Sequence, residues 1–314
     1  MTDSLTALCL PNGVLNPDAR GWSARPRLDS TLHRRWGRNK RWDYWCVIAE
    51  PLVIQLTVVD LDYLQIGTAA VFDLADGPLL ERVTVRPPGR WIQQGGIVDG
   101  PVHFTSRKLE MDFLPTDEGT HLKADFDGVH IDVLAAPPGD SLNVVVPWTD
   151  RRFQFTSKQI GRGATGTVDI DGEVFDIDGH AALDFGRGRW PLRTRWNWGA
   201  GAGQTKSGFV GLQLGSQWTD GTGQNENGVF LDGVLHKLDC DLAFERTDTW
   251  RVFSTEGDAV DLRLVPLRER PMRGGPIGSL DLSFGHWQGQ VRAHGQVIQI
   301  EDILGWAEEM RVRW

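Results

Sequence analysis

The chain has 314 residues, and its 33 Lys and Arg residues against 42 Asp and Glu residues give a formal net charge of -9 at pH 7. Duplex DNA and anionic membranes are bound by basic surfaces, so this charge balance argues against both as partners. No run of about 18 apolar residues is present, and we therefore expect no transmembrane helix. The composition favours a protein whose partner is a small molecule.

Cysteine and histidine usage gives no indication of a metal site. The three cysteines, Cys9, Cys46 and Cys240, contain no CxxC pair, and their odd number is unlike a disulfide framework. The eight histidines show neither HxH nor HExxH spacing. The first residues lack the basic segment and long apolar run of a signal peptide. We expect a cytoplasmic protein that uses no metal and no other cofactor, while the oligomeric state stays open.

An aromatic strand is predicted early in the chain, at RWDYW, residues 41–45. Alternation along a strand places Trp42 and Tyr44 on one face, with Asp43 and Trp45 on the other. The whole chain has 14 Trp and 13 Phe residues but only 2 Tyr residues. Such large flat side chains fill a wide barrel core or line a cavity.

Asp-Gly dipeptides then divide the chain into hairpins. In HLKADFDGVHIDVLA, residues 121–135, apolar residues alternate on both sides of Asp127-Gly128, and residues 166–179 repeat the pattern around Asp171-Gly172. This arrangement is typical of hairpins with type I′ turns. No segment has a convincing helical period, and the C-terminal EDILGWAEEMRVRW is either a short helical turn or a closing strand. The sequence predicts an all-β fold of antiparallel barrels or barrel-like sandwiches with little helix.

Two prolines and a glycine interrupt the strand pattern in AAPPGDSLNVVVPW, and Pro147 interrupts it again. Prolines and glycines of this kind mark boundaries between structural units. We therefore predict an N-terminal β domain over residues 1–146 and a C-terminal β domain over residues 147–314. The C-terminal domain is expected to carry the functional site.

The segment DFGRGRWPLRTRWNWGAGAG, residues 184–203, concentrates arginine, tryptophan and glycine. It is interpreted as the end of a strand at Asp184, a tight turn and a second strand, with the GAGAG run forming a bend or bulge. In the second strand Trp196 and Trp198 share one face, and Arg195 and Asn197 share the other. Two strands with paired aromatic faces, here and at residues 41–45, suggest the wall of a ligand site.

Carboxylates are the candidate catalytic groups. A carboxylate beside apolar rings has its neutral form favoured, whereas a neighbouring arginine favours the charged form. Asp184 precedes Arg187 and is the strongest candidate, and Glu226 in the polar loop QNENG is the second. Glu226 is also compatible with a loop residue that caps local backbone, and Asp43 with a surface ion pair to Arg41.

The segment from Phe155 to Gly199 resembles the two-domain lipocalin-like carotenoid 1,2-hydratases. Gly166, Gly172 and Gly179 lie in step with that family's motif, as do Asp184 and the closing WNWG. The resemblance implies two lipocalin-like halves and acid-base addition of water to an isoprenoid double bond, with Asp184 at the family's essential aspartate. Ala182 stands where that family has tyrosine, and the neighbouring arginines suggest a more polar or anionic ligand.

The whole chain resembles an uncharacterised bacterial family, domain of unknown function 2804. The shared motifs are LNPxAxGWS, VPW followed by FTxK, LDxGRGxWP, EN followed by DGxxHK, and a terminal RW. In this sequence they cover residues 15–23, 146–158, 183–191, 226–237 and 313–314. They add Lys158 and Trp190 to the candidate site.

Three functions are compatible with these residues. The first is an acid-base hydratase, isomerase or cyclase for a terpenoid-like or lipid-like molecule, with Asp184 as proton donor and tryptophans that stabilise positive charge. The second is a carbohydrate-active enzyme that uses Asp184 and Glu226 as paired carboxylates. The third is a binding protein in which Asp184 forms a structural ion pair with Arg187 or Arg189. The candidate catalytic residues are Asp184 and Glu226, and the candidate substrate-binding residues are Trp42, Asp43, Tyr44, Lys158, Arg187, Trp190, Trp196, Asn197 and Trp198.

Overall fold

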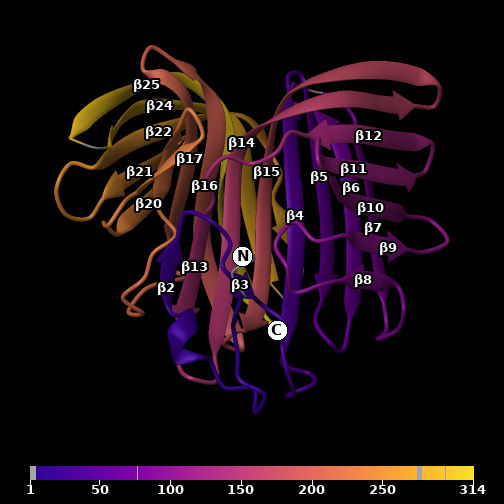
Figure 1. Ribbon diagram of the computed structural model, residues 1–314. Coiled ribbons are helices and arrows are strands. Elements are labelled where there is room, and N and C mark those ends of the chain that lie inside the picture. Colours follow the sequence, from indigo (N-terminus) through magenta and orange to yellow (C-terminus); the bar gives the residue numbers. More distant parts are fainter. Residues whose placement is uncertain (1–4, 76, 274–277, 294) are drawn as a thin grey trace. The chain divides into compact units, whose positions relative to one another are not determined.

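The computed structural model describes residues 5–75, 77–273, 278–293 and 295–314, which fold into antiparallel sheets with almost no helix (Figure 1). The described contacts divide the chain into two compact units. The first unit runs to Trp190, and the second contains the chain from Pro191 onward together with residues 74 and 75. The predicted all-β fold of two lipocalin-like halves is confirmed.

The first unit contains one 3-10 turn, η1 (Pro17–Ala19), and a short parallel pair formed by β1 (Thr6–Ala7) and β3 (Leu28–Asp29). Its large sheet has the order β7-β6-β5-β4-β15-β14-β12-β11-β10-β9-β8, and β13 pairs with both β14 and β2. The strands of this sheet are β2 (Gly21–Ser23), β4 (Lys40–Ala49), β5 (Leu52–Asp60), β6 (Gln65–Asp73), β7 (Leu79–Arg86), β8 (Ile92–Gln94), β9 (Val102–Thr105), β10 (Glu110–Thr116), β11 (Gly119–Phe126), β12 (Val129–Ala135), β13 (Leu142–Pro147), β14 (Phe153–Ile170) and β15 (Glu173–Arg189).

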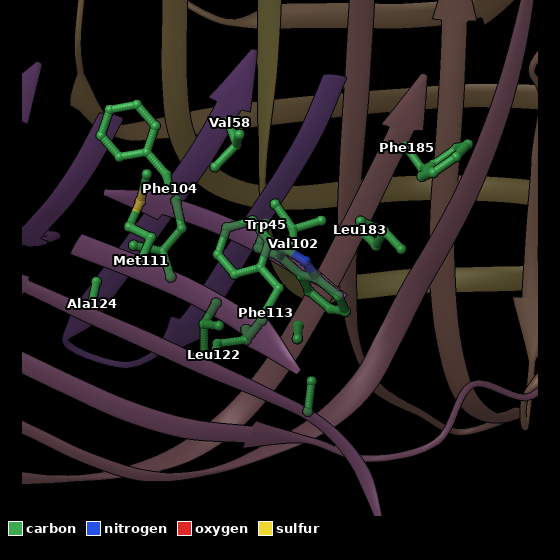
Figure 2. Close-up of a cluster of buried hydrophobic side chains, with 14 of the residues drawn as sticks. Trp45, Val58, Val102, Phe104, Met111, Phe113, Leu122, Ala124, Leu183 and Phe185 are labelled. Atoms are coloured by element: carbon green, nitrogen blue, oxygen red, sulfur yellow. The ribbon is translucent and has the colours of Figure 1, made fainter. Parts of the chain in front are cut away.

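The large sheet curls so that its two halves face each other across one core. The Trp45 ring on β4 meets the Phe113 ring on β10 edge to face, with 6.5 Å between centroids. On β6, a Cβ at Gly67 would come within 2.6 Å of the Phe104 ring on β9, so only glycine leaves room for that ring. Figure 2 shows this core, in which the Trp45 and Phe113 rings lie against each other and Phe104 lies farther to the side. The curled half-barrel explains why aromatic residues are so frequent.

The second unit is built from a separate sheet of order β19-β18-β17-β16-β25-β24-β22-β21-β20, in which β23 pairs with β24. Its own core contains the fully buried Trp250 and Trp287. Its strands are β16 (Arg193–Thr205), β17 (Gly208–Ser216), β18 (Gly228–Leu231), β19 (Val234–Lys237), β20 (Leu242–Arg246), β21 (Trp250–Ser254), β22 (Val260–Glu269), β23 (Met272–Arg273), β24 (Gly278–Ala293) and β25 (Gln296–Arg313). The C-terminal segment is thus a strand.

The two predicted Asp-Gly hairpins are confirmed. Asp127 and Gly128 connect β11 to β12 with φ of +42° and +80°, and Asp171 and Gly172 connect β14 to β15 with φ of +52° and +91°. Positive φ at both central residues is the requirement of a type I′ turn, whose twist matches that of the flanking strands. The second turn joins β14 to β15, the strands of Lys158 and Asp184, and the register of that pair shifts once, between Ile160 and Arg162.

The division into compact units differs from the predicted boundary near residue 146. The prolines that suggested that boundary lie between β12 and β14, yet both strands belong to the first unit. β14 pairs with β12 and also with β13, and β15 pairs with β4 from the start of the chain. The long β14–β15 hairpin therefore completes the first sheet, because sheet pairing over long sequence distances overrides local breaks.

The GAGAG run also differs from its prediction of a bend or bulge. It lies inside β16, whose pairing with β17 continues through the whole run without a register shift, while its pairing with β25 extends to Gly201. A Cβ at Gly199 would come within 2.9 Å of the Trp287 ring, and a Cβ at Gly201 within 3.0 Å. The glycines thus make room for a buried tryptophan of the second core.

Candidate active site

A carboxylate and an ammonium group lie on one face of the first sheet, at its centre. Asp184 on β15 pairs with Lys158 on β14 and with Tyr44 on β4, so these three side chains share a face. Thr156 and Trp42 lie on the same face beside them, since Gly186 pairs with both. β14 and β15 form one hairpin, and β4, their neighbour in the sheet, comes from the start of the chain.

Asp184 is held through one of its two oxygens. The Lys158 Nζ lies 2.7 Å from Asp184 Oδ1, and the Thr156 hydroxyl donates a hydrogen bond of 3.2 Å to the same oxygen. No described residue hydrogen-bonds to Asp184 Oδ2. The Asp184 side chain keeps 18% of its exposure, whereas that of Lys158 keeps 7%. The ammonium balances the carboxylate charge, and the second oxygen stays available for a proton or a ligand.

Polar groups continue along this face. The Gln55 amide on β5 donates a hydrogen bond of 2.7 Å to the Tyr44 hydroxyl, and both side chains are buried. On the other side, Gln154 lies across Gly186 and Gly188, where a Cβ would come within 2.4 Å and 2.5 Å of its amide. The glycines of the GRG motif therefore leave space for a polar side chain.

Trp190, predicted to bind substrate, ends the first unit. Its indole N–H donates to Gln154 Oε1, and its ring is half-buried. The hydrogen bond connects Trp190 to the same polar face that carries Lys158. The LDxGRGxWP motif thus combines a carboxylate, two small residues and a tethered tryptophan in one local structure.

The sequence suggested that Asp184 stands at the end of a strand, but in the structure it does not. β15 continues to Arg189 and keeps its pairing with β14 throughout the GRG motif. The turn lies beyond it, between Trp190 and Arg193. Because Asp184 and Arg187 are three residues apart on one strand, their side chains point to opposite faces of the sheet, and this decides the role of the arginines.

Arg187 lies on the opposite face of β15 from Asp184, so it is not an arginine neighbour of that carboxylate, although the two are close in the sequence. Its guanidinium is 1% exposed and lies 2.7 Å from Asp43 Oδ2, with further hydrogen bonds to the backbone oxygens of Trp42 and Gly95. Asp43 also accepts a hydrogen bond of 2.5 Å from Gln94. Asp43 therefore pairs with Arg187 in the interior. The alternative interpretation required a surface ion pair between Asp43 and Arg41.

Burial dominates the electrostatics of this internal pair. It raises the pKa of the Asp43 carboxyl, against the attraction of Arg187, and it lowers the pKa of the Arg187 guanidinium, against the attraction of Asp43. Both pKa shifts favour the neutral form of the group, because neither group is solvated. The pair is a structural element of the first core, because both side chains are buried and bonded to each other.

Arg189 has a similar structural role. It is 2% exposed and donates to Asn39 Oδ1 at 2.8 Å, to the His33 backbone oxygen at 2.6 Å and to the backbone oxygen of Gly13. It thereby ties the N-terminal loops to β15. Neither Arg187 nor Arg189 pairs with Asp184, which instead forms its ion pair with Lys158.

The remaining predicted residues belong to the second unit, whereas Asp184, which the sequence analysis placed in the C-terminal domain with them, belongs to the first. Trp196 donates an indole hydrogen bond of 2.8 Å to Glu308 Oε1, and Trp198 donates one of 2.9 Å to Gln213 Oε1. The Trp198 ring meets the Trp306 ring edge to face at 5.1 Å. These tryptophans lie apart from the core that holds Trp287.

Asn197 and Glu226 also lie in the second unit. Asn197 is buried, donates to the Glu308 backbone oxygen at 3.3 Å and accepts a hydrogen bond from Gln217. Glu226 is 8% exposed in the loop before β18, and its backbone oxygen accepts a hydrogen bond of 3.1 Å from Gln213. Each unit therefore contains its own group of buried carboxylate, amide and aromatic side chains.

One group of described side chains has metal-ligand chemistry. His103, Glu110 and Asp112 offer ligand atoms that lie within 4.8 Å of one another on β9 and β10. The His103 ring already lies 2.7 Å from Asp112.

Among the described residues, no helix has the length and apolar character that a membrane crossing requires.

Sequence reasoning did not select Thr156, Gln154 or Glu308. Thr156 lies in the FTxK motif two residues before Lys158, so alternation along a predicted strand would have placed it on the same face. Glu308 lies in a segment whose secondary structure stayed open. Gln154 had no sequence signal, because its place depends on the glycines of a neighbouring strand.

The fold and the sequence define this chain as a two-unit, lipocalin-like, all-β protein. The sequence model of the family described as domain of unknown function 2804 matches residues 2–314. The chain belongs to that family. It matches none of the curated proteins with which it was compared.

Solved structures share the fold at low sequence identity. A protein from Nitrosomonas europaea described as an AttH has a TM-score of 0.56 and 15% identity, covering 87% of this chain and 92% of its own. Kievitone hydratase from Nectria haematococca has a TM-score of 0.55 and 13% identity, with 88% and 89% covered. CghA with Sch210972 has a TM-score of 0.51 and 12% identity, with 90% of each chain covered.

Proposed function

We propose that this protein is an acid-base enzyme of the hydratase, isomerase or cyclase type that acts on a hydrophobic small molecule. The observation that supports this proposal is the state of Asp184. Its Oδ1 is held by Lys158 and Thr156, and no described residue hydrogen-bonds to its Oδ2. A positioned carboxylate with one oxygen free toward solvent is suited to proton transfer.

The ion pair modifies the role first expected for Asp184. Beside the Lys158 ammonium the aspartate is a carboxylate, which accepts a proton before it can donate one. In a hydration, Oδ2 takes a proton from the attacking water and returns it to the substrate carbon that the water does not attack. Lys158 balances the negative charge at the site throughout. In an isomerisation, Oδ2 takes the proton from one carbon and returns it to another.

The surroundings of Asp184 suit a substrate that is mostly apolar. Trp42 and Tyr44 lie on the same face of the sheet, and the buried valines of β13 continue it beyond Lys158. Aromatic faces also provide a large apolar contact area for such a substrate. Kievitone hydratase, which shares the fold, is by its name a hydratase, and this supports the reaction class.

The test is proton exchange into candidate substrates in D₂O. The purified protein is incubated with terpenoid and unsaturated-lipid alkenes, and deuterium incorporation and water addition are followed by mass spectrometry. Asp184→Asn should lower the exchange rate about 10²–10⁴-fold, the usual contribution of a positioned acid-base group. Asp176→Asn, on the exposed part of the same strand, is the matched control. Wild-type binding of these compounds without exchange, or full exchange by Asp184→Asn, would show that the protein is a binding protein or uses another residue.

A further inference from the structure

A polar pocket of about 400 Å³ lies within the first unit, on the side of the sheet that carries Asp43. Its charged lining residues are Arg41 of β4 and two aspartates, Asp60 and Asp62, at the end of β5. Arg41 lies on the same face of β4 as Asp43, and Tyr44, which stands beside Asp184, lies on the opposite face, so the pocket is distinct from the Asp184 site. The other lining residues are Trp36, Gln65, Pro88, Gly89, Ile92 and Gln94.

The two aspartates are held in place by the protein. Arg41 Nη1 lies 3.1 Å from Asp62 Oδ1 and 3.4 Å from Asp60 Oδ2. Asp62 Oδ2 accepts hydrogen bonds from the backbone N–H groups of Gly37 at 2.7 Å and Asn39 at 3.0 Å. The pocket wall thus contains two carboxylates and one guanidinium, so it is rich in hydrogen-bond acceptors.

Two amides of the wall have acceptor oxygens that no described residue satisfies. Gln65 is 6% exposed and its Nε2 lies 3.4 Å from Asp60 Oδ2, but its Oε1 is buried and accepts no hydrogen bond. Gln94 donates to Asp43, and its Oε1 is likewise buried and unsatisfied. A buried acceptor without a donor is unfavourable, so both amides favour a ligand that supplies O–H or N–H groups.

An exposed aromatic ring completes the pocket. Trp36 keeps 72% of its exposure although it lines the cavity. Its loop is fixed on both sides, because Arg34 donates to the Pro11 backbone oxygen at 2.9 Å and Gly37 donates to Asp62. A large ring that is held in water beside polar groups is a platform for an apolar ligand face.

We propose that this pocket binds a polyhydroxylated ligand of the sugar or polyol class. Hydroxyl groups donate to the carboxylates and to the amide oxygens, and they also accept from Arg41, so one type of group satisfies the whole wall. A sugar ring has a C–H face that packs on Trp36. A cationic ligand fits less well, because the Arg41 guanidinium already neutralises part of the carboxylate charge and would repel a second cation.

Saturation-transfer NMR and calorimetry with D-glucose, D-galactose, myo-inositol and methylammonium chloride test this proposal. The wild-type chain should bind at least one of the polyols with a Kd of about 1 mM or lower, and methylammonium more weakly. Trp36→Ala should weaken that binding at least about tenfold. Gln65→Leu, which removes one unsatisfied oxygen at similar volume, should also weaken it, while Trp22→Ala, at an exposed tryptophan of β2 outside the pocket, should not.

The result that would overturn the proposal is binding of no polyol, binding of methylammonium alone, or polyol binding that Trp36→Ala and Gln65→Leu both leave unchanged. The first two outcomes would reject the ligand class, and the third would place the ligand elsewhere. Asp184→Asn should keep polyol binding, so a failure of the acid-base proposal and a failure of this one are distinguishable.

Discussion

Lys158 and Asp184 stand directly opposite each other in the β14–β15 ladder, with 2.7 Å between the ammonium and Oδ1. A directly opposed pair of unlike charges stabilises the strand register as well as the carboxylate. Arg187, much closer to Asp184 in the sequence, projects from the other face and pairs with Asp43. The two ion pairs therefore belong to different environments on a single strand.

Replacing Lys158 with methionine should lower turnover about as strongly as Asp184→Asn does, since general acid-base groups contribute about 10²–10⁴-fold. The variant leaves Asp184 without the ammonium that balances its charge. Exchange assays in D₂O, with Asp184→Asn measured alongside, would test this. A Lys158→Met protein that exchanges at the wild-type rate would mean that the pair only stabilises the sheet.

Replacing Arg187 with methionine should lower the free energy of unfolding by about 3–5 kcal/mol, because it leaves the Asp43 carboxylate buried and unpaired. Urea denaturation of the purified variant measures the change. The double variant Asp43→Leu with Arg187→Met should recover part of the loss, since no lone charge remains. For comparison, Arg195→Met should change the free energy by less than about 0.5 kcal/mol, because the Arg195 side chain is 55% exposed.

Replacing a glycine of the GAGAG run, residues 199–203, with alanine should be tolerated at Gly203 but not at Gly199 or Gly201. At Gly199 and Gly201 a Cβ would come within 2.9–3.0 Å of the buried Trp287 ring, and Ala at either position should cost about 1–3 kcal/mol. At Gly203 the nearest contact would be 3.4 Å, so Ala there should be near neutral. Thermal unfolding followed by tryptophan fluorescence compares the three, and equal destabilisation would contradict the packing explanation.

Lys40 should make stability depend on pH in the alkaline range. Burial lowers the pKa of its amine from 10.5 to about 8, and the cation lies over the Tyr63 ring. Between pH 8 and 10.5 the unfolded chain binds more protons at this residue than the folded chain does, so this group makes stability rise with pH there. Below pH 8 both states are protonated and the cost of burying the charge is fully present.

Lys40→Met removes that dependence. The difference in unfolding free energy between Lys40→Met and the wild type should favour the variant most below pH 8 and shrink toward pH 10.5. Denaturant titrations from pH 7 to pH 10.5 measure this difference. A difference that is constant over the range would show that Lys40 keeps its ordinary pKa in the folded chain.

Much of the fold could be predicted from short-range patterns. The Asp127-Gly128 and Asp171-Gly172 turns follow from the backbone conformations that type I′ hairpins require, and these are local properties. The faces of residues 41–45 follow from alternation, and the pairing of β4 with β15 agrees with them. Asp178-Gly179, another dipeptide of the same type, lies inside β15 instead, so the dipeptide alone does not determine a turn.

The sequence by itself determined the all-β class, the principal hairpins and the residue types of the site, because these depend on periodicity and turn chemistry over a few residues. Only the tertiary structure decided that Lys158 is the partner of Asp184, that Arg187 and Arg189 are interior residues, and that Gly199 and Gly201 accommodate Trp287. The arginine and tryptophan contacts join segments that are far apart in the chain, and the Lys158–Asp184 pair depends on the register shift between Ile160 and Arg162. They depend on sheet order and on where β15 ends, and a change of one residue in a strand's length or register turns a side chain to the opposite face.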